Sequence, residues 1–247
     1  MKPTKPACIF EAGVCEKIAR QTGFTLVELL TVISIIAILA AIMFPAFTSV
    51  MENGRKAACL NNIKQLTAAF TIYSSEFGNR LPGCAYGASG AGMPGGWVYY
   101  SHYPANDTTT PAAFTVRLGG LFRYVRGAGV YVCPSDIQGR VSGNSYSINS
   151  NLFVLTDQGP AVSRVLSAFT TTSRWLLLCE EAYNLDPSNT SDDYLRKNGT
   201  DDGFLIAGSD SISIRHGGGS TCAFLDGHAK WCRPEGIASM HYLTGGM

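Results

Sequence analysis

The stretch Gly23-Phe24-Thr25-Leu26-Val27-Glu28 leads directly into an apolar run that ends at Met43-Phe44-Pro45. From Phe24 to Phe44 this run is about as long as the ~20 residues that a helix needs to cross a ~30 Å hydrocarbon core. The run consists mostly of Leu, Ile, Val and Ala and has no internal Gly or Pro, a composition that favours helix over strand. The sequence therefore predicts a membrane-spanning helix close to the N-terminus.

Glu28 is the one charged residue in this run. A carboxylate near the centre of a bilayer costs at least ~2–3 kcal/mol unless it has a partner, so Glu28 is a candidate functional residue. A plain signal anchor would leave Glu28 unexplained. A cleavable signal peptide fits no better, because its apolar core spans only ~7–15 residues and a small-residue cleavage site follows it.

The charge pattern indicates how the helix is oriented. The formal net charge of the 247-residue chain is +1, which gives no electrostatic reason to expect a nucleic acid as a partner. Basic residues precede the apolar run, and the next ones follow well beyond its end: Lys2, Lys5, Lys17 and Arg20 before it, and Arg55 and Lys56 after it. The positive-inside rule then predicts a cytoplasmic N-terminus and an extracytoplasmic remainder.

The segment from Gly23 to Leu30 resembles the processing site of type IV pilins and type II secretion pseudopilins. The resemblance implies that a prepilin peptidase cuts after Gly23 on the cytoplasmic side and that the new N-terminal residue, Phe24, is N-methylated. It also implies that Glu28 pairs with the terminal amine of a neighbouring subunit during filament assembly. A buried carboxylate requires a cation, and cleavage after Gly23 creates one at membrane depth. Pro45 stands where many pilins carry a helix-kinking proline.

The expected fold is α+β and pilin-like, with a long N-terminal transmembrane and amphipathic helix packed on a mainly antiparallel β-sheet domain. We expect a removed leader at 1–23, the membrane half of the helix at 24–44, its amphipathic half at 45–78, and an extracytoplasmic globular domain at 79–247. The helix should end near Gly78. An apolar stripe at alternating spacings of four and three residues indicates the amphipathic half: Cys59, Ile63, Leu66, Phe70, Tyr73 and Phe77.

The globular part offers several strand signals. We expect a short helix at Leu118–Val125 and strands at Val130–Val132, Ser145–Leu155 and Trp175–Cys179, the last of them central in its sheet. We expect Glu180-Glu181 to lie at the solvated end of the Trp175–Cys179 strand. Because adjacent strand residues point to opposite faces, these two carboxylates should not share a site.

The C-terminal region holds His216 and, after nine residues, Asp226-Gly227. Asp-Gly between two strands predicts a hairpin with a two-residue type I′ turn. That turn would place Cys222 and Cys232 on opposite faces, whereas a three-residue turn would place them opposite one another. We expect His216 to bond the turn carboxylate or the backbone; the alternative is a metal or acid–base site made by His216, Asp226 and His228.

This H-x9-D-G ending resembles one found on many proteins with pilin-type N-termini, although the resemblance does not supply its role. The stretches Cys133–Asp136 and Cys59–Gln65 resemble the same set.

Six cysteines lie beyond the leader, and none are two to four residues apart, so the ligand pairs of zinc ribbons are absent. An oxidising compartment permits disulfides, but the sequence does not decide among the pairings or whether any pair is bridged.

A late polar loop contains Asp192, Asp193, Asp201 and Asp202. Some pseudopilins hold calcium in a late loop, and clustered carboxylates suit that ion. The loop lacks the EF-hand spacing, however, so a solvated loop is the expectation and calcium the alternative. No other cofactor is expected.

These observations predict a non-enzymatic subunit of a type IV pilus-like or type II secretion filament in the bacterial inner membrane. Its partners would be the membrane, prepilin peptidase, and copies of itself or other pilin-like subunits. The alternative is a membrane-tethered extracytoplasmic binding module, suggested by long loops and the aromatic cluster at Trp97–Tyr100 and Tyr103. A tethered enzyme that uses His216 and Asp226 is a third reading, but no hydrolase or nucleotide-binding motif supports it.

Overall fold

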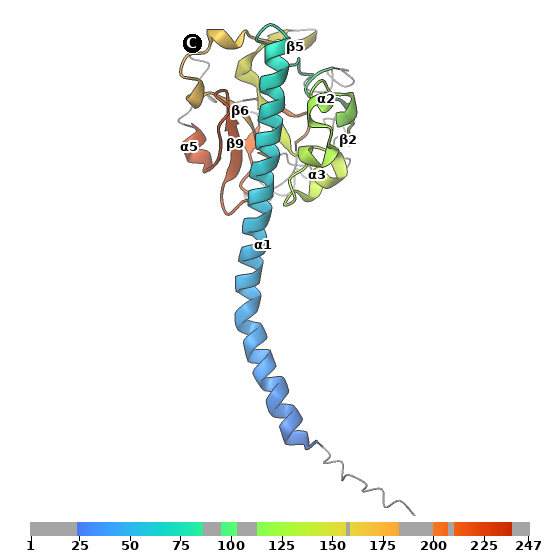
Figure 1. Cartoon of the computed structure of the whole chain (residues 1–247), viewed down its shortest axis with the longest axis vertical. Helices are drawn as coiled ribbons and strands as arrows, with labels where there is room; N and C mark the ends of the chain where they lie inside the picture. The colour runs from blue at the N-terminus through green and yellow to red at the C-terminus, as the bar shows by residue number, and fades with distance from the viewer. Residues whose placement is uncertain are drawn as a thin grey trace, which may run out of the picture. The chain divides into compact units, whose positions relative to one another are not determined.

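The computed structural model describes residues 24–85, 95–102, 113–156, 159–182, 200–206 and 210–238. The leader predicted at 1–23, including Gly23, therefore lies outside the described residues. The chain divides into two compact units, whose boundary lies between Phe47 and Thr48. Figure 1 shows the long helix α1, which is followed in the chain by strands and short helices.

Helix α1 runs from Leu26 to Glu76 and continues through Pro45. Its large apolar side chains from Leu26 to Met51 are exposed, and among the described residues it is the one helix long and apolar enough to cross a membrane. The helix ends just before Gly78 and Asn79, which adopt positive φ angles of 63° and 62°. This is a left-handed termination, and it agrees with the end predicted near Gly78.

The main sheet has the strand order β10-β9-β6-β3-β7, and β8 also pairs with β6. Its pairs are antiparallel except β3 with β7, which is parallel. All seven residues of β6 are buried, as expected for the central strand. The bounds are β3 Tyr146–Asn149, β6 Leu176–Ala182, β7 Phe204–Leu205, β8 Ser211–Ile212, β9 Ser220–Phe224 and β10 Ala229–Cys232.

Shorter elements surround this sheet. Two small antiparallel pairs are β1 Tyr100–His102 with β2 Ala113–Phe114, and β4 Phe153–Thr156 with β5 Gly159–Ser163. The short α-helices are α2 Phe122–Val125, α3 Ile137–Ser142 and α5 Pro234–Ala238. The 3₁₀ turns are η3 Val116–Leu118, η4 Ala128–Tyr131, η5 Ser150–Leu152, η6 Leu166–Ala168 and η7 Thr172–Arg174.

The predicted α+β fold is confirmed, but several local predictions are wrong. Val130–Val132 is not a strand, because η4 occupies most of it. Strand preference depends on a neighbouring strand to pack against, and here the Tyr131 carbonyl instead accepts a single bond from the Ser145 N–H at 2.9 Å. The strand predicted at Ser145–Leu155 is divided into β3 and β4 by η5, and the helix predicted at Leu118–Val125 is shortened to α2.

The apolar stripe of α1 forms one wall of the core. Its first four members, Cys59, Ile63, Leu66 and Phe70, are buried, whereas Phe77 is 44% exposed and stacks on Tyr73 with ring centroids 4.2 Å apart.

The aromatic cluster also belongs to the core. Trp97 and Tyr100 are buried, and the Trp97 indole N–H donates to the Gly203 carbonyl at 2.9 Å. Tyr103 lies outside the described residues. The described part of the cluster is therefore a packing feature rather than an exposed binding surface.

One disulfide joins Cys59 of α1 to Cys133, with the two Cα atoms 5.2 Å apart. Cys84, Cys179, Cys222 and Cys232 are buried free thiols.

The predicted two-residue turn of the C-terminal hairpin is wrong. Ala229 pairs with Ala223 and the Phe224 N–H bonds the His228 carbonyl, which leaves a three-residue loop, Leu225 to Gly227. Gly227 takes φ 92°, as such loops require of their last residue. Cys222 then lies opposite Lys230 and Cys232 opposite Ser220, so the two thiols share a face as diagonal neighbours rather than direct partners.

We predict that Phe70→Ala lowers the free energy of unfolding by about 3–5 kcal/mol, because it leaves a cavity under α1. Phe77→Ala is the matched control and should cost no more than ~1.5 kcal/mol, the worth of an exposed aromatic pair. Urea titration of the full chain in detergent, followed by tryptophan fluorescence, measures both. Equal losses from the two variants would contradict this assignment of the core face.

Candidate functional site

Glu28 lies in the first turn of α1 and already has partners within its own chain. The Glu28 carboxylate accepts bonds from the Thr25 N–H at 2.9 Å and the Thr25 hydroxyl at 2.7 Å, and the Glu28 N–H donates back to Thr25 Oγ1 at 3.2 Å. The two residues therefore form a reciprocal capping box. The spacing Thr-x-x-Glu would have revealed this local role in the sequence. Phe24, the proposed new N-terminus, is exposed beside it.

A second constellation lies in the unit that begins at Thr48, and His216 is at its centre. The imidazole Nδ1 lies 2.8 Å from Glu52 Oε1 on α1, and Nε2 lies 2.9 Å from Glu180 Oε1 on β6. His216 and Glu180 are fully buried as side chains, while Glu52 is 34% exposed. The imidazole thus joins the helix to the central strand.

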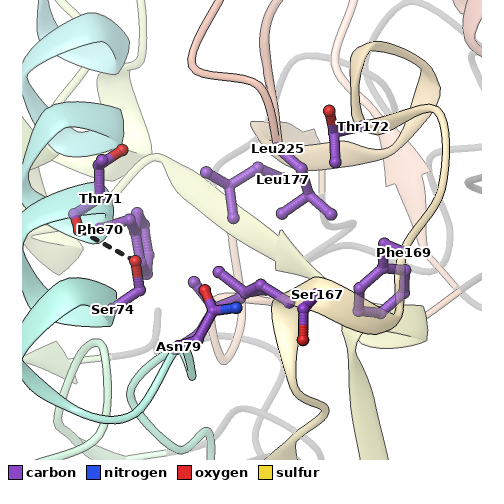
Figure 2. A pocket seen from close by; sticks show the side chains of 11 residues that line it. Phe70, Thr71, Ser74, Asn79, Ser167, Phe169, Thr172, Leu177 and Leu225 are labelled. Carbon is purple, nitrogen blue, oxygen red and sulfur yellow. Dashed lines mark hydrogen bonds between the residues drawn. The ribbon is translucent and has the colours of Figure 1, made fainter.

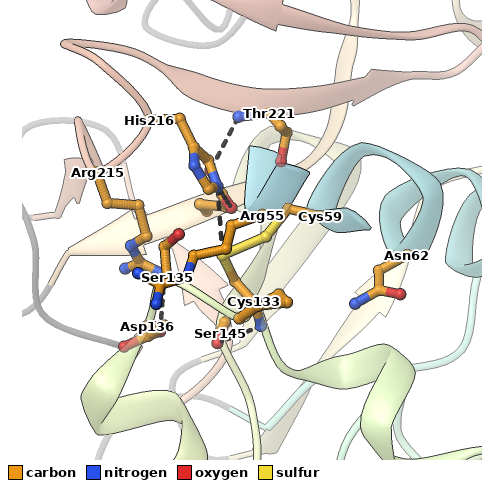
Figure 3. Close-up of a disulfide and its surroundings, with 12 residues drawn as sticks. Arg55, Cys59, Asn62, Cys133, Ser135, Asp136, Ser145, Arg215, His216 and Thr221 are labelled. Atoms are coloured by element: carbon orange, nitrogen blue, oxygen red, sulfur yellow. Dashed lines mark hydrogen bonds and ion pairs between the residues drawn. A yellow bond between two sulfur atoms is a disulfide. The ribbon is translucent and has the colours of Figure 1, made fainter. Parts of the chain in front are cut away.

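The loop that carries Cys133 completes this constellation (Figure 3). The Cys133 sulfur lies 3.3 Å from His216 Nε2, and the Ser135 hydroxyl donates to Glu52 at 2.9 Å. Asp136 binds the Arg215 guanidinium at 2.7 Å in a fully buried ion pair. The stretches around Cys59, Cys133 and His216, which the sequence separates widely, therefore meet in one place. Backbone support comes from the Thr221 N–H, which donates to Glu180 Oε2 at 2.9 Å.

The charges of this cluster stabilise one another. Burial by itself would lower the pKa of His216, but the hydrogen bonds and negative charges of Glu180 and Glu52 outweigh it and raise that pKa. Burial would likewise raise the pKa of Glu180, but the hydrogen bond and charge of His216 and the charge of Arg215 hold it below its ordinary value. Each group therefore favours the charged form of the other.

The expectation that Glu180-Glu181 is a solvated strand end is wrong, because both residues are completely buried. Strand β6 continues to Ala182 and has β3 on one side and β8 and β9 on the other, so its end is covered. The two carboxylates do make separate contacts, as their alternation predicted. Glu180 faces His216, whereas Glu181 accepts bonds from the Ser147 and Thr200 hydroxyls.

The expected bond between His216 and the turn carboxylate is replaced by the bonds to Glu52 and Glu180. Asp226 instead pairs with His228 at the exposed hairpin, where Nδ1 and Oδ1 are 2.5 Å apart, and Gly227 supplies the left-handed turn residue. His216, Asp226 and His228 are thus divided between two places. The alternative of an acid–base or metal site made by these three residues is therefore wrong.

Two groups of described residues have donor atoms within 4.8 Å of one another: Cys59, Cys133, Glu180 and His216 in one, and Glu181, Asp201 and Asp202 in the other. In the first group the two sulfurs are bonded to each other and are not thiolates, so it does not supply a tetrahedral metal site in this state. The expectation of a solvated loop is wrong for Asp201 and Asp202, which are buried and belong to the second group. Asp192 and Asp193 lie outside the described residues.

A separate pocket of about 340 Å³ opens between the last turns of α1 and the segment around η6 and η7 (Figure 2). Its walls are apolar side chains with a few hydroxyl and amide groups, and no charged side chain lines it: Phe70, Thr71, Ser74, Asn79, Leu81, Leu166, Ser167, Phe169, Thr172, Leu177 and Leu225. It therefore offers volume for a small apolar molecule but no acid–base group.

The stability that His216 contributes should depend on pH. Because its folded-state pKa is raised above 6.5, this contribution is fully present below about pH 6.5 and is lost as the pH rises through the folded-state pKa. We predict that His216→Asn costs about 3–5 kcal/mol at pH 6, the cost of breaking a buried ion pair, and less at pH 9. Urea titrations of both chains at these pH values measure the difference.

His228→Asn, at the exposed hairpin, is the control and should cost little at either pH. Parallel pH profiles for the wild type and His216→Asn would contradict the charged His216–Glu180 pair.

Comparison with known proteins identifies a motif in the N-terminal segment. Residues 18–44 match the family model of the prokaryotic N-terminal methylation motif, whereas no curated protein and no solved structure matches the chain. The matched segment contains Gly23, Phe24 and Glu28 but not the H-x9-D-G ending. Such a motif implies processing by a prepilin peptidase and assembly with other pilin subunits. The chain thus carries a prepilin-type methylation motif at the start of one helix of membrane-spanning length.

Proposed function

We propose that this chain is a non-enzymatic structural subunit of a filament of the type IV pilus or type II secretion class. Before assembly it would sit in the bacterial inner membrane with a cytoplasmic N-terminus, and prepilin peptidase would cut after Gly23 and leave Phe24 to be methylated. The observation that carries this proposal is the match of residues 18–44 to the methylation motif at the head of α1.

The surface of α1 supports the proposal. From Leu26 to Met51 its large apolar side chains are exposed all around the helix, so this segment needs an apolar environment supplied from outside the chain. A bilayer supplies it before assembly, and the helices of neighbouring subunits would supply it in a filament core. Glu28 would then exchange one of its Thr25 bonds for the charged amine of a neighbouring Phe24.

The constellation around His216 has a structural role in this proposal. It fixes the second half of α1 to the sheet through Glu52, and the Cys59–Cys133 disulfide does the same covalently. Because the His216 imidazole is fully buried and both its nitrogens are occupied by carboxylates, we propose no catalytic function for it.

The second candidate, a membrane-tethered binding module, is favoured by the 340 Å³ pocket beside Phe70 and Leu177. Volumes of this size accommodate small ligands. Since Trp97 and Tyr100 are buried and Tyr99 is half-buried, this pocket replaces the aromatic cluster as the reason to consider binding.

Two substitutions separate the roles of Glu28. Glu28→Gln keeps an oxygen that can accept from Thr25 but removes the charge, whereas Glu28→Ala removes both. We predict that both variants insert into the membrane and that filament yield falls at least ~10-fold for both, the effect of losing a desolvated ion pair worth ~2 kcal/mol or more. Immunoblotting of sheared filaments measures the yield, and mass spectrometry of the mature chain reports cleavage and methylation. A wild-type yield from Glu28→Gln would refute the proposed pairing with a neighbouring amine.

Cross-linking distinguishes the filament subunit from the tethered module. The stripe from Cys59 to Phe70 is buried in its own domain, so the engineered cysteines belong on the exposed segment, for example Ile35→Cys with Ile42→Cys. We predict a ladder of oligomers after oxidation in the membrane. The otherwise wild-type chain controls for native cysteines, and the same pair combined with Glu28→Ala should give a weaker ladder. Monomers alone from the engineered pair would favour the tethered module.

A further inference from the structure

Four side chains of the types that bind zinc meet around the disulfide: Cys59, Cys133, Glu180 and His216. All four are buried, and His216 lies beside the two bonded sulfurs (Figure 3). Its Nε2 atom is 3.3 Å from the Cys133 sulfur and 2.9 Å from Glu180 Oε1. Bonded sulfurs are not metal ligands, because the thiolate is the form that binds. Reduction of this one bond would therefore supply the two ligands that the set lacks.

The outer contacts of these side chains are those of a metal site. A metal-binding histidine usually donates its other ring N–H to a carboxylate, and His216 Nδ1 lies 2.8 Å from Glu52 Oε1. A ligating carboxylate is itself hydrogen-bonded, and Glu180 Oε2 accepts from the Thr221 N–H at 2.9 Å. These contacts leave His216 Nε2 and Glu180 Oε1 as the atoms that would face a metal.

The donor set selects zinc rather than a hard cation. Thiolate and imidazole ligands suit zinc, whereas calcium and magnesium take oxygen ligands. Tetrahedral zinc has bonds of about 2.0–2.3 Å, so neighbouring donor atoms stand roughly 3.3–3.8 Å apart. The two distances measured from His216 Nε2, 3.3 and 2.9 Å, are already close to this range. The two sulfurs would separate once the bond between them is broken.

We propose that the reduced chain binds one zinc ion through Cys59, Cys133, His216 and Glu180. The disulfide and the zinc ion are then alternative links between α1 and the segment that carries Cys133. With zinc bound, the helix stays fastened to the sheet when the disulfide is absent. This proposal goes beyond the filament function and does not depend on it.

The exchange between the two forms is a two-electron reaction. A dithiol reductant supplies two electrons and two protons, becomes a disulfide, and converts the Cys59–Cys133 bond to two thiols. Zinc then displaces both thiol protons and the Nε2 proton of the His216 imidazolium, so three protons pass to the solvent. In the reverse reaction the two thiolates give two electrons to a disulfide reagent. That reagent takes up two protons and becomes two thiols, His216 regains its proton, and zinc is released.

The experiment uses the full chain in detergent. The chain is reduced with a dithiol, separated from it without air, and dialysed against ZnCl₂. We expect atomic absorption to find one zinc per reduced chain and none per oxidised chain. CoCl₂ in place of ZnCl₂ should give the thiolate-to-cobalt charge-transfer absorption of a tetrahedral site. A small disulfide added to the zinc-loaded chain should release the ion to a chromophoric chelator.

Two variants test the ligands. Loss of an outer partner of a metal ligand costs about 10–100-fold in affinity, so Glu52→Ala should weaken zinc binding by that factor. Cys133→Ser removes a ligand itself and should cost at least ~100-fold. Glu52 is 34% exposed, and its variant serves if Cys133→Ser does not fold. Competition with the chelator measures both affinities.

Cys222→Ser is the matched control. Cys222 lies opposite Cys179 on the neighbouring strand, so these buried thiols are the rival site for a soft metal. The control should bind zinc as tightly as the reduced wild type does. The proposal would be overturned by equal zinc contents of the reduced and oxidised wild type, or by a reduced wild type that binds none. Undiminished affinity in Cys133→Ser and Glu52→Ala would overturn it as well.

Discussion

The contact on which the unit that begins at Thr48 most depends is the imidazole of His216, held between Glu52 of α1 and Glu180 of β6. A buried charge is costly unless its partners are in place, so this contact is formed only when the helix, the central strand and the C-terminal strands are correctly assembled. The apolar stripe of α1 would tolerate small shifts along the sheet. The two hydrogen bonds of the His216 imidazole would not tolerate such a shift, because each requires its carboxylate at a fixed position. They therefore define the register between helix and sheet.

The membrane helix and the central strand could be predicted from sequence because each is a continuous apolar run with a clear end. Leu26–Phe44 has the length that a bilayer requires, and Trp175–Cys179 has the composition of a fully buried strand. The N-terminal motif could be recognised from the spacing of Gly23, Phe24 and Glu28 alone. Each of these signals depends only on residues that are neighbours in the sequence. It can therefore be recognised without knowing which elements pack against that segment in the fold.

The polar cluster could not be predicted in the same way, because its members come from four distant parts of the chain. Paired glutamates after a strand are usually solvated, and only the pairing of β8 and β9 with β6 shows why these are not. One signal for Glu52 was present: it stands seven residues before Cys59, in line with the apolar stripe of the same helix. The three-residue hairpin loop shows a similar limit, since Asp-Gly suits both loop lengths.

The disulfide between Cys59 and Cys133 has a mechanical consequence. The two cysteines are 74 residues apart in sequence, and one of them belongs to α1. If tension is applied between the membrane end of the helix and the C-terminal strands, the force passes through the sulfur–sulfur bond rather than through that loop. An unbridged loop could extend by roughly 250 Å, at about 3.3–3.6 Å per residue. The bridge removes this slack, so the domain can be pulled by its helix without being unravelled from that end.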